Sequence, residues 1–522
     1  MLVKTFAGAV HGVEATMITV EISAGGIPDN GDGKTTPFYF LVGLPDNAVK
    51  EGWQRIEAAL RHSKYALPRV KLVINLAPAD LRKEGSAYDL PIALGVYAAS
   101  NQLHFNDLDK FVVMGELSLD GSVRPIKGAL PIAIQAKRDN LRGLILPKAN
   151  AREAAIVSDI EVYGIENVGE AIDFFMGKKQ LERVIVDTRE EFKNQSQHHE
   201  VDFTDVRGQE NIKRALEIAA AGGHNAILIG PPGAGKTMLA RRLPTILPPL
   251  SLNEALETTK IHSVAGILPA EASLVATRPF RSPHHTISDV ALVGGGSVPM
   301  PGEISLSHNG VLFLDELPEF KRTVLEVLRQ PMEERRVTIS RAKVTIEYPA
   351  SFMLVASMNP CPCGYYNHPE KDCVCGFGVV KRYLSKISGP LLDRIDLHVE
   401  VTPVKLEELA AVSHVSESSE TIAKRVVRAR EIQEARFQHN KGVYANAQMP
   451  SRMVREVCGL DTEGIELLKT AMARLQLSAR AYDRILKVAR TIADLGESAD
   501  IKTDHLAEAI QFRSLDRANW AG

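Results

Sequence analysis

The octapeptide GPPGAGKT, at Gly230–Thr237, limits the possible folds of this chain more than any other stretch. It matches the pattern G-x-x-x-x-G-K-[ST] at every position, and it lies between the apolar stretch NAILIG and the helix-forming stretch MLARRL. In this context the glycines allow close approach of the backbone, and the loop N–H groups and the helix N-terminus surround a phosphate. We therefore predict a nucleotide-binding loop that consists of Gly230, Pro231, Pro232, Gly233, Ala234, Gly235, Lys236 and Thr237. Lys236 is expected to reach the β- and γ-phosphates, and the Thr237 hydroxyl is expected to bind Mg²⁺.

Two later apolar stretches also end in polar residues. GVLFLDE predicts a buried strand followed by Asp315 and Glu316, and SFMLVASMNP predicts another strand that ends at Asn359. Asp315 is the candidate for a second Mg²⁺ contact, made directly or through water. Glu316 is the candidate for the base that orients the attacking water. Asn359 is expected to hydrogen-bond the same water. Together these residues predict an enzyme that hydrolyses ATP with Mg²⁺.

The chain of 522 residues is predicted to contain three domains and a linker. Residues 1–177 alternate β-branched stretches such as MITVEI with helical periods such as NAVKEGWQRIEAALRHS, which indicates an α+β or α/β domain. Residues 178–200 are polar and charged and are predicted to be a linker. Residues 201–403 form the predicted α/β nucleotide-binding core, and residues 404–522 show only helical patterns, as in AYDRILKVARTIADL.

The composition excludes several classes of protein. The net charge is −2, so nucleic acid would have to bind through local patches rather than a globally basic surface. The chain has no run of about 18 uninterrupted apolar residues, so we expect no membrane span. The N-terminus lacks a long apolar region and the cysteines are few and clustered, which together favour the reducing cytoplasm.

Four of the five cysteines lie in the fifteen-residue stretch CPCGYYNHPEKDCVC. Cys361, Cys363, Cys373 and Cys375 form two C-x-C pairs, which can supply four thiolates to one structural Zn²⁺. A disulfide is disfavoured because the cytoplasm is reducing and a bridge within C-x-C is strained. Redox chemistry and a metal-free loop stay open as alternatives, and His368 could replace one cysteine as a ligand.

The order of four motifs adds a resemblance. GPPGAGKT, VLFLDE, ASMNP and GPLLDRID follow one another as in AAA+ ATPases, and they most resemble the branch that holds magnesium-chelatase ATPase subunits and replicative MCM helicases. The resemblance implies that Asn359 is sensor 1 and that Arg394 is an arginine finger acting on the neighbouring subunit's nucleotide. Arg480 matches the sensor 2 arginine, with Arg484 as a second candidate. A finger acting in trans implies a ring, which in this branch is usually a hexamer; the alternative for Arg394 is a structural ion pair with Asp393 or Asp396.

The whole chain resembles one family, the ComM/YifB-type magnesium-chelatase-like proteins of bacteria. RPFRSPHHTISDVALVGGG, GVLFLDELPEF, NPCPCG and SGPLLDRIDLHVEV are typical of it. The resemblance implies a hexameric DNA helicase that drives branch migration of recombination intermediates during natural transformation. It also implies DNA as a partner, and a recombinase and other competence or recombination proteins as further candidates.

The N-terminal block resembles the Lon-protease-like domain, a ribosomal S5-type fold also found in the recombination protein RadA. NLAPADLRKEGSAYDLPIAL and GELSLDGSVRPIKGALPIAIQAK carry this likeness. The peptidase serine position holds Ala87, with Ser86 one residue away, and the two lysine positions hold Leu130 and Ile132. Because a nucleophilic serine needs a base within reach, we expect an inactive fold that binds DNA or stabilises the ring.

Two regions are candidates for DNA contacts. MEERRVTISRAKVTIEYPA, at residues 332–350, predicts a β-hairpin whose tip carries Arg341 and Lys343, and cations there could follow a phosphate backbone. The second is the insert with Arg278 and Arg281, predicted to be a pore or DNA loop. His284 and His285 of this insert could suggest a metal, but no cysteine lies close to them in sequence, and we expect no metal site there.

Three other functions were weighed against a DNA motor. The chain could be the ATPase subunit of a metal chelatase, although we expected such subunits to lack the N-terminal domain. It could be an ATP-dependent protease, against which Ala87, Leu130 and Ile132 argue. A non-enzymatic scaffold would leave the hydrolysis residues without a role.

Overall fold

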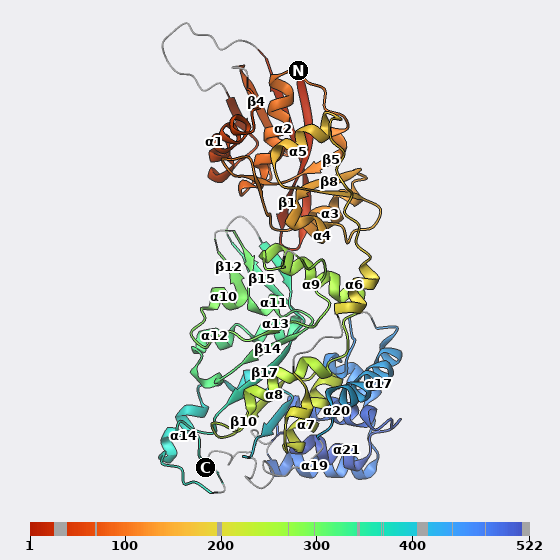
Figure 1. The fold of residues 1–522 in the computed structure, drawn as a ribbon. Helices are drawn as coiled ribbons and strands as arrows, with labels where there is room; N and C mark the ends of the chain where they lie inside the picture. Colours follow the sequence, from red (N-terminus) through yellow and green to blue (C-terminus); the bar gives the residue numbers. More distant parts are fainter. Residues whose placement is uncertain are drawn as a thin grey trace. The chain divides into compact units, whose positions relative to one another are not determined.

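The computed structural model describes residues 1–25, 39–67, 70–195, 201–269, 271–296, 298–341, 345–366, 368, 370–403, 416–440, 442–475 and 477–513 (Figure 1). The chain divides into two compact units. The first contains residues 1–195 and 252–276, and the second contains residues 196–251 and 277–522.

A mixed seven-stranded sheet forms the centre of the first unit, in the order β3-β4-β2-β1-β5-β8-β9. Its strands are β1 (Leu2–His11), β2 (Glu14–Ala24), β3 (Tyr39–Val42), β4 (Leu72–Ala77), β5 (Phe111–Val113), β8 (Gly143–Pro147) and β9 (Glu161–Ile165). β1 and β2 pair antiparallel along their length, and their alternating residues bury one face in the core. A small ribbon, β6 (Glu116–Leu117) with β7 (Val123–Arg124), lies outside this sheet.

Several helices of the first unit pack on this sheet through apolar faces. α2 (Asp89–Ser100) is buried on nearly every side, which explains its continuous apolar sequence DLPIALGVYAAS. The others are α1 (Asn47–His62), α3 (Ala129–Arg138), α4 (Lys148–Ala154), α5 (Val168–Phe175), α6 (Thr188–Gln195) and α9 (Leu252–Ala265).

The unit boundaries differ from the predicted ones at two places. Residues 178–195, predicted to be part of a linker, belong to the first unit, where Arg183 bridges to Tyr163 of β9. Residues 252–276, predicted to belong to the nucleotide-binding core, also join the first unit. There the N–H of Gly128 donates to the carbonyl of Ser263 at 3.1 Å.

A fully parallel five-stranded sheet organises the second unit, in the order β11-β14-β17-β10-β18. Its strands are β11 (Phe280–Arg281), β14 (Val311–Leu314), β17 (Met353–Met358), β10 (Ala226–Ile229) and β18 (Leu397–Glu400). Its three central strands are entirely buried, so their sequences are continuously apolar rather than alternating. The nucleotide loop, Asp315 and Asn359 follow neighbouring strands, so all three meet at one edge of the sheet.

Two short ribbons extend the second unit. β15 (Arg336–Ser340) and β16 (Thr345–Pro349) form the predicted hairpin, with Ile339 opposite Ile346. β12 (Gly294–Gly295) pairs with β13 (Met300–Pro301). The helices that accompany them are α8 (Lys236–Arg242), α10 (Asp289–Val293), α11 (Glu303–Leu306), α12 (Arg322–Glu326), α13 (Arg329–Glu334), α14 (Phe377–Leu384) and α15 (Gly389–Leu392).

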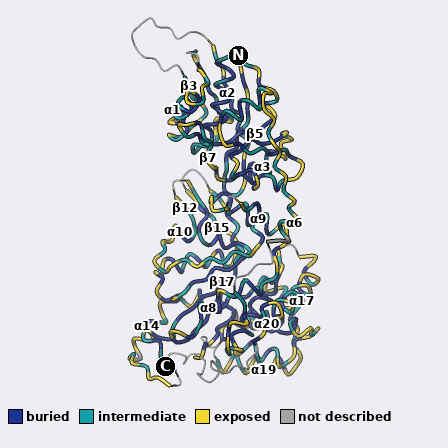
Figure 2. The backbone as a smooth tube through the Cα atoms, viewed as in Figure 1, coloured by how far each residue is buried: buried dark blue, intermediate teal, exposed yellow. Residues whose placement is uncertain are grey.

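The C-terminal helices pack against α7 (Glu210–Gly222) and share its hydrophobic core. They are α17 (Ser419–Phe437), α18 (Ser451–Val457), α19 (Thr462–Leu475), α20 (Ala479–Leu495) and α21 (Thr503–Gln511). The predicted helical lid therefore folds as part of the second unit and does not separate from it. Figure 2 shows the buried backbone of β17 and the more exposed course of α14. Among the described residues, no helix is both long and apolar enough to cross a membrane.

Candidate functional site

The predicted nucleotide loop connects β10 to α8. Gly233 and Gly235 have φ angles of 78° and 83°, a left-handed conformation that favours glycine, which explains two of the motif's glycines. The Lys236 ammonium donates to the carbonyls of Gly230 at 2.7 Å and Pro231 at 2.9 Å, and to Asn359 Oδ1 at 3.1 Å. Burial lowers the pKa of Lys236, and Asp315 and Glu316 oppose this shift. The Lys236 ammonium is thus held in the loop and contacts Asn359, the residue predicted to be sensor 1.

Asp315 lies at the end of β14 and faces the start of α8. The Thr237 hydroxyl donates to Asp315 Oδ2 at 2.7 Å, and the Ser357 hydroxyl of β17 donates to the other carboxylate oxygen. Hard divalent cations prefer oxygen ligands, and a hydroxyl beside a carboxylate is the pair used for Mg²⁺ in phosphate-loop enzymes. The two residues predicted to hold Mg²⁺ therefore fit that ion.

Glu316 follows Asp315 and points toward solvent. Its side chain is 59% exposed, and its φ angle of 53° is unusual for a residue other than glycine. Nδ1 of His285 lies 3.6 Å from Glu316 Oε2. The ring of His285 is tilted by 35° against that of His284, with ring centroids 4.0 Å apart. The spacing of His285 and Glu316 in the sequence does not predict this pairing. The strand order contains a signal for it, because β11 and β14 are parallel neighbours and residues after their carboxyl ends meet at one edge.

Arg394 follows α15 and is mostly buried, with 8% of its surface exposed. Its guanidinium pairs with Glu333 of α13 at 2.6 Å and donates to the carbonyl of Pro390 at 2.6 Å, while Nε has no partner. The ion pair considered from sequence, with Asp393 or Asp396, is thus replaced by one with Glu333. The role of Arg394 as an arginine finger stays a prediction.

The two sensor 2 candidates, both on α20, differ in environment. Arg484 pairs with Asp396, which also accepts from His224 at 3.1 Å, and all three lie between α20 and the sheet. Burial raises the pKa of Asp396, but Arg484 and His224 outweigh burial and hold this pKa well below its usual range. Arg480 has a side chain that is 69% exposed and lies 3.6 Å from Asp393. Arg484 is committed to the core, so Arg480 is the more available of the two.

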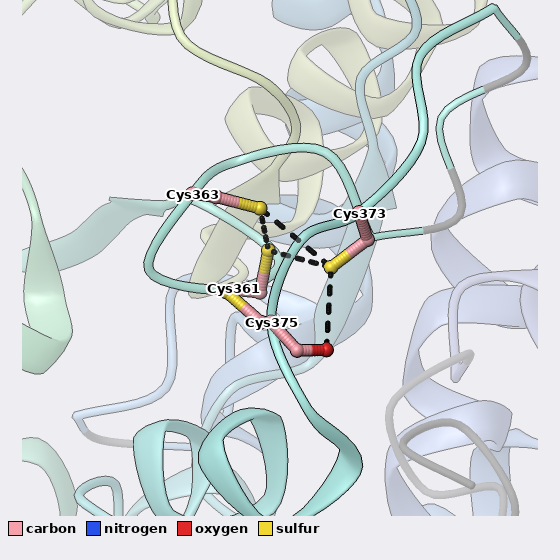
Figure 3. Close-up of side chains that lie close together, drawn as sticks. All are labelled: Cys361, Cys363, Cys373 and Cys375. Carbon is pink, nitrogen blue, oxygen red and sulfur yellow. Dashed lines mark hydrogen bonds between the residues drawn. The ribbon is translucent and has the colours of Figure 1, made fainter.

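The four cysteines predicted to bind zinc converge on one point (Figure 3). All four Sγ atoms lie within 4.8 Å of one another. Cys361 Sγ is 3.3 Å from Cys363 Sγ and 3.7 Å from Cys373 Sγ, and the last two are 3.6 Å apart. A tetrahedral Zn²⁺ with Zn–S bonds of about 2.3 Å requires sulfur separations of about 3.8 Å. The thiols are free, and this geometry fits a four-thiolate site.

Two further features concern this cysteine loop. His368 is not part of the convergent group, and its Nδ1 accepts hydrogen bonds from the backbone N–H groups of Glu370 and Lys371.

Gly364 has a φ of 84°, and a Cβ at this position would collide with the ring of Pro232 in the nucleotide loop. The cysteine loop thus packs directly on the loop predicted to bind phosphate.

Both arginines predicted as DNA contacts in the insert make contacts within the chain. Arg278 donates to the carbonyls of Pro248 at 2.6 Å and Asn309 at 2.7 Å, and Arg281 forms a two-pronged pair with Glu303 at 2.6 and 2.7 Å. Both guanidinium groups tie chain segments together, and their role as DNA contacts stays a prediction. Arg341 is exposed at the end of β15, and Lys343 lies outside the described residues.

The peptidase-like positions lie in the first unit. Leu130 and Ile132 are fully buried, and the Ser86 hydroxyl donates to the Glu116 carboxylate. A carboxylate therefore accompanies Ser86, which the sequence analysis did not predict. Within the described chain, Ser86 has no hydrogen bond to a histidine or lysine.

Comparisons with known proteins identify the family of this chain. Residues 202–409 match the family model described as "Magnesium chelatase, subunit ChlI", and residues 416–513 match its C-terminal counterpart. The chain is 43% identical over 518 residues to "Competence protein ComM" of Haemophilus influenzae, covering 99% of this chain and 98% of that one. It is 44% identical over 509 residues to "Uncharacterized protein YifB" of Escherichia coli, covering 98% and 96%.

The chain belongs to the ComM/YifB family of magnesium-chelatase-like proteins. A third relative, "Lon protease 2" of Bacillus subtilis, is 31% identical over 154 residues, which are 27% of this chain and 26% of that protein. Residues 29–150 match a model described as "Subunit ChlI of Mg-chelatase".

Proposed function

We propose that this protein is an ATP-driven DNA translocase that works as a hexameric ring and promotes branch migration of recombination intermediates during natural transformation. The observation that carries the proposal is the meeting of Lys236, Thr237, Asp315 and Asn359 at one sheet edge, beside Glu316. The full-length similarity to a competence protein supports the cellular role.

The hydrolysis chemistry follows from the positions of these side chains. Mg²⁺ bound by Thr237 and Asp315 would neutralise charge on the phosphates, and Ser357 fixes the orientation of the Asp315 carboxylate. Lys236 neutralises the terminal phosphates, while Asn359, in contact with Lys236, keeps a polar group beside them. Glu316, exposed at the same edge, accepts a hydrogen bond from the attacking water and orients it.

The proposed DNA contact is the β15–β16 hairpin. Its tip follows Arg341, which is exposed, and the hairpin directly precedes the sensor 1 strand β17. A conformational change at Asn359 would therefore reach the hairpin through one continuous stretch of chain. Exposed cations at such a tip track phosphates without reading sequence, which suits a motor that moves along any DNA.

We further propose that Cys361, Cys363, Cys373 and Cys375 hold one structural Zn²⁺. The sulfur separations support four-thiolate coordination, which leaves no open position for catalysis. Elemental analysis should find about one zinc per chain, and Cys373→Ser should lose it. Cys458→Ala is the matched control, because Cys458 is a buried thiol outside the cluster. Protein without zinc that assembles and hydrolyses ATP normally would contradict this assignment.

One experiment tests the motor against the other functions. The ATPase rate is measured alone and with single-stranded DNA, duplex DNA and a four-way junction, with oligomer mass measured in parallel. A DNA motor predicts stimulation by DNA and a hexamer. An ATPase rate that is unchanged by DNA but rises with a large porphyrin-binding subunit would support the chelatase alternative. The descriptions of the matching family models name that enzyme. Casein degradation would support the protease.

A further inference from the structure

A cleft of about 390 Å³ opens beside the candidate ATPase site. One wall carries Glu316 and Asn359, together with Pro362 of the cysteine loop. The other wall carries Arg382 and Lys386, which lie in and just after α14 at the outer edge of the second unit (Figure 1). The base and sensor side chains therefore line the same cleft as two cations and a second carboxylate, Glu319.

The helix α14 is fixed to the site at both of its ends. It begins directly after the cysteine cluster, two residues beyond Cys375. Near its other end Tyr383 is buried, and it lines the same cleft as Asn359. Any group on the cleft-facing side of α14 is thus held at a set position relative to Asn359.

The charged side chains that line the cleft do not all form ion pairs with one another. Lys386 lies 3.4 Å from Glu319, and Glu316 lies 3.6 Å from His285. The guanidinium of Arg382 is exposed and has no hydrogen-bond or ion-pair partner within the described residues. An exposed guanidinium with no protein partner is available to bind an anion, and its planar fork of donors matches a phosphate.

We propose that Arg382 is a further phosphate-binding residue, which contacts the terminal phosphate of the nucleoside triphosphate held by the same subunit. The proposal rests on the proposed function, because it takes ATP as the ligand of the loop at Gly230–Thr237. Arg382 would then distinguish ATP from ADP, whereas Lys236 and the loop N–H groups also contact the phosphates that both nucleotides share.

The test is the affinity of the full-length protein for ADP and for a non-hydrolysable ATP analogue, measured by calorimetry. Arg382→Ala should lower the affinity for the analogue roughly tenfold to a hundredfold, the range for a charge-assisted hydrogen bond, and should leave the affinity for ADP unchanged. Arg382→Lys should restore part of the loss. Lys381→Ala, which changes the neighbouring exposed cation outside the cleft lining, should bind both nucleotides like the wild type.

Each other outcome overturns a defined part of the reasoning. Unchanged binding of the analogue by Arg382→Ala, or equal weakening of both nucleotides, contradicts the proposal while leaving the ATPase function intact. Rescue of Arg382→Ala activity by mixing with Lys236→Ala subunits would show action on the neighbouring subunit and refute the same-subunit contact. A wild type that binds neither nucleotide refutes the proposed function itself.

Discussion

Arg394 gives the sharpest test of whether this protein works as a ring. If its guanidinium acts on the neighbouring subunit's nucleotide, it must leave the contacts it makes within its own chain. Those contacts are Glu333 at 2.6 Å and the Pro390 carbonyl at 2.6 Å. Glu333 has a side chain that is 58% exposed, so the ion pair is screened by solvent and contributes at most about 1 kcal/mol.

The two roles of Arg394 differ greatly in magnitude. An arginine finger is worth about 10³–10⁵ in rate, or roughly 4–7 kcal/mol, which far exceeds the value of the Glu333 pair. Arg394→Ala should therefore lower the ATPase rate by about a thousandfold or more. Glu333→Gln removes only the intramolecular partner, so it should leave the rate within about fivefold of the wild type.

The assay is steady-state ATPase of each variant and of mixed rings, with circular dichroism as the control for folding. Arg394→Ala subunits mixed with Lys236→Ala subunits should regain activity, because some interfaces then combine an intact loop with an intact finger. The reasoning is refuted if Glu333→Gln is as inactive as Arg394→Ala, since the pair would then be what matters. It is also refuted if well-exchanged mixed rings show no rescue.

Three further substitutions test other parts of the account. Glu316→Gln should bind ATP and assemble but lose at least about a hundredfold in hydrolysis, since the phosphate and Mg²⁺ ligands remain; normal turnover would remove Glu316 from the mechanism. Neutralising Arg341 and Lys343 together should leave the basal ATPase rate unchanged. It should also lower the slope of log affinity for DNA against log salt concentration by up to about 2. An unchanged slope would move the DNA path elsewhere. Ser86→Ala should leave ATPase, DNA unwinding and proteolysis assays unchanged, and loss of any activity would reopen a catalytic role for the Ser86–Glu116 pair.

The features predicted correctly from sequence are those whose information is local. The glycines of the nucleotide loop and the apolar strands before Asp315 and Asn359 are contiguous patterns, and the folded chain contains each of them. The two C-x-C pairs are also local, because a loop of nine residues between them brings their sulfurs together. In each case a short stretch contains the full set of groups that define the feature.

The features that the sequence did not reveal depend on distant partners. The charge of Arg281 is visible in the sequence, but its ion pair with Glu303, which lies 22 positions away, is not. Residues 252–276 look like part of the nucleotide core in chain order, yet they pack in the first unit against residues more than a hundred positions earlier. The cleft between Asn359 and Arg382 exists only because α14 folds back onto the sensor strand.

The central claim is that ATP hydrolysis at the site of Lys236 and Glu316 moves DNA. Its most direct test follows a mobile four-way junction with labelled arms, incubated with the protein and ATP, and measures conversion of the junction to two duplexes. The account predicts conversion that requires ATP and is abolished by Glu316→Gln. Active ATP hydrolysis by the wild type with no junction conversion, or conversion by Glu316→Gln at the wild-type rate, would contradict it.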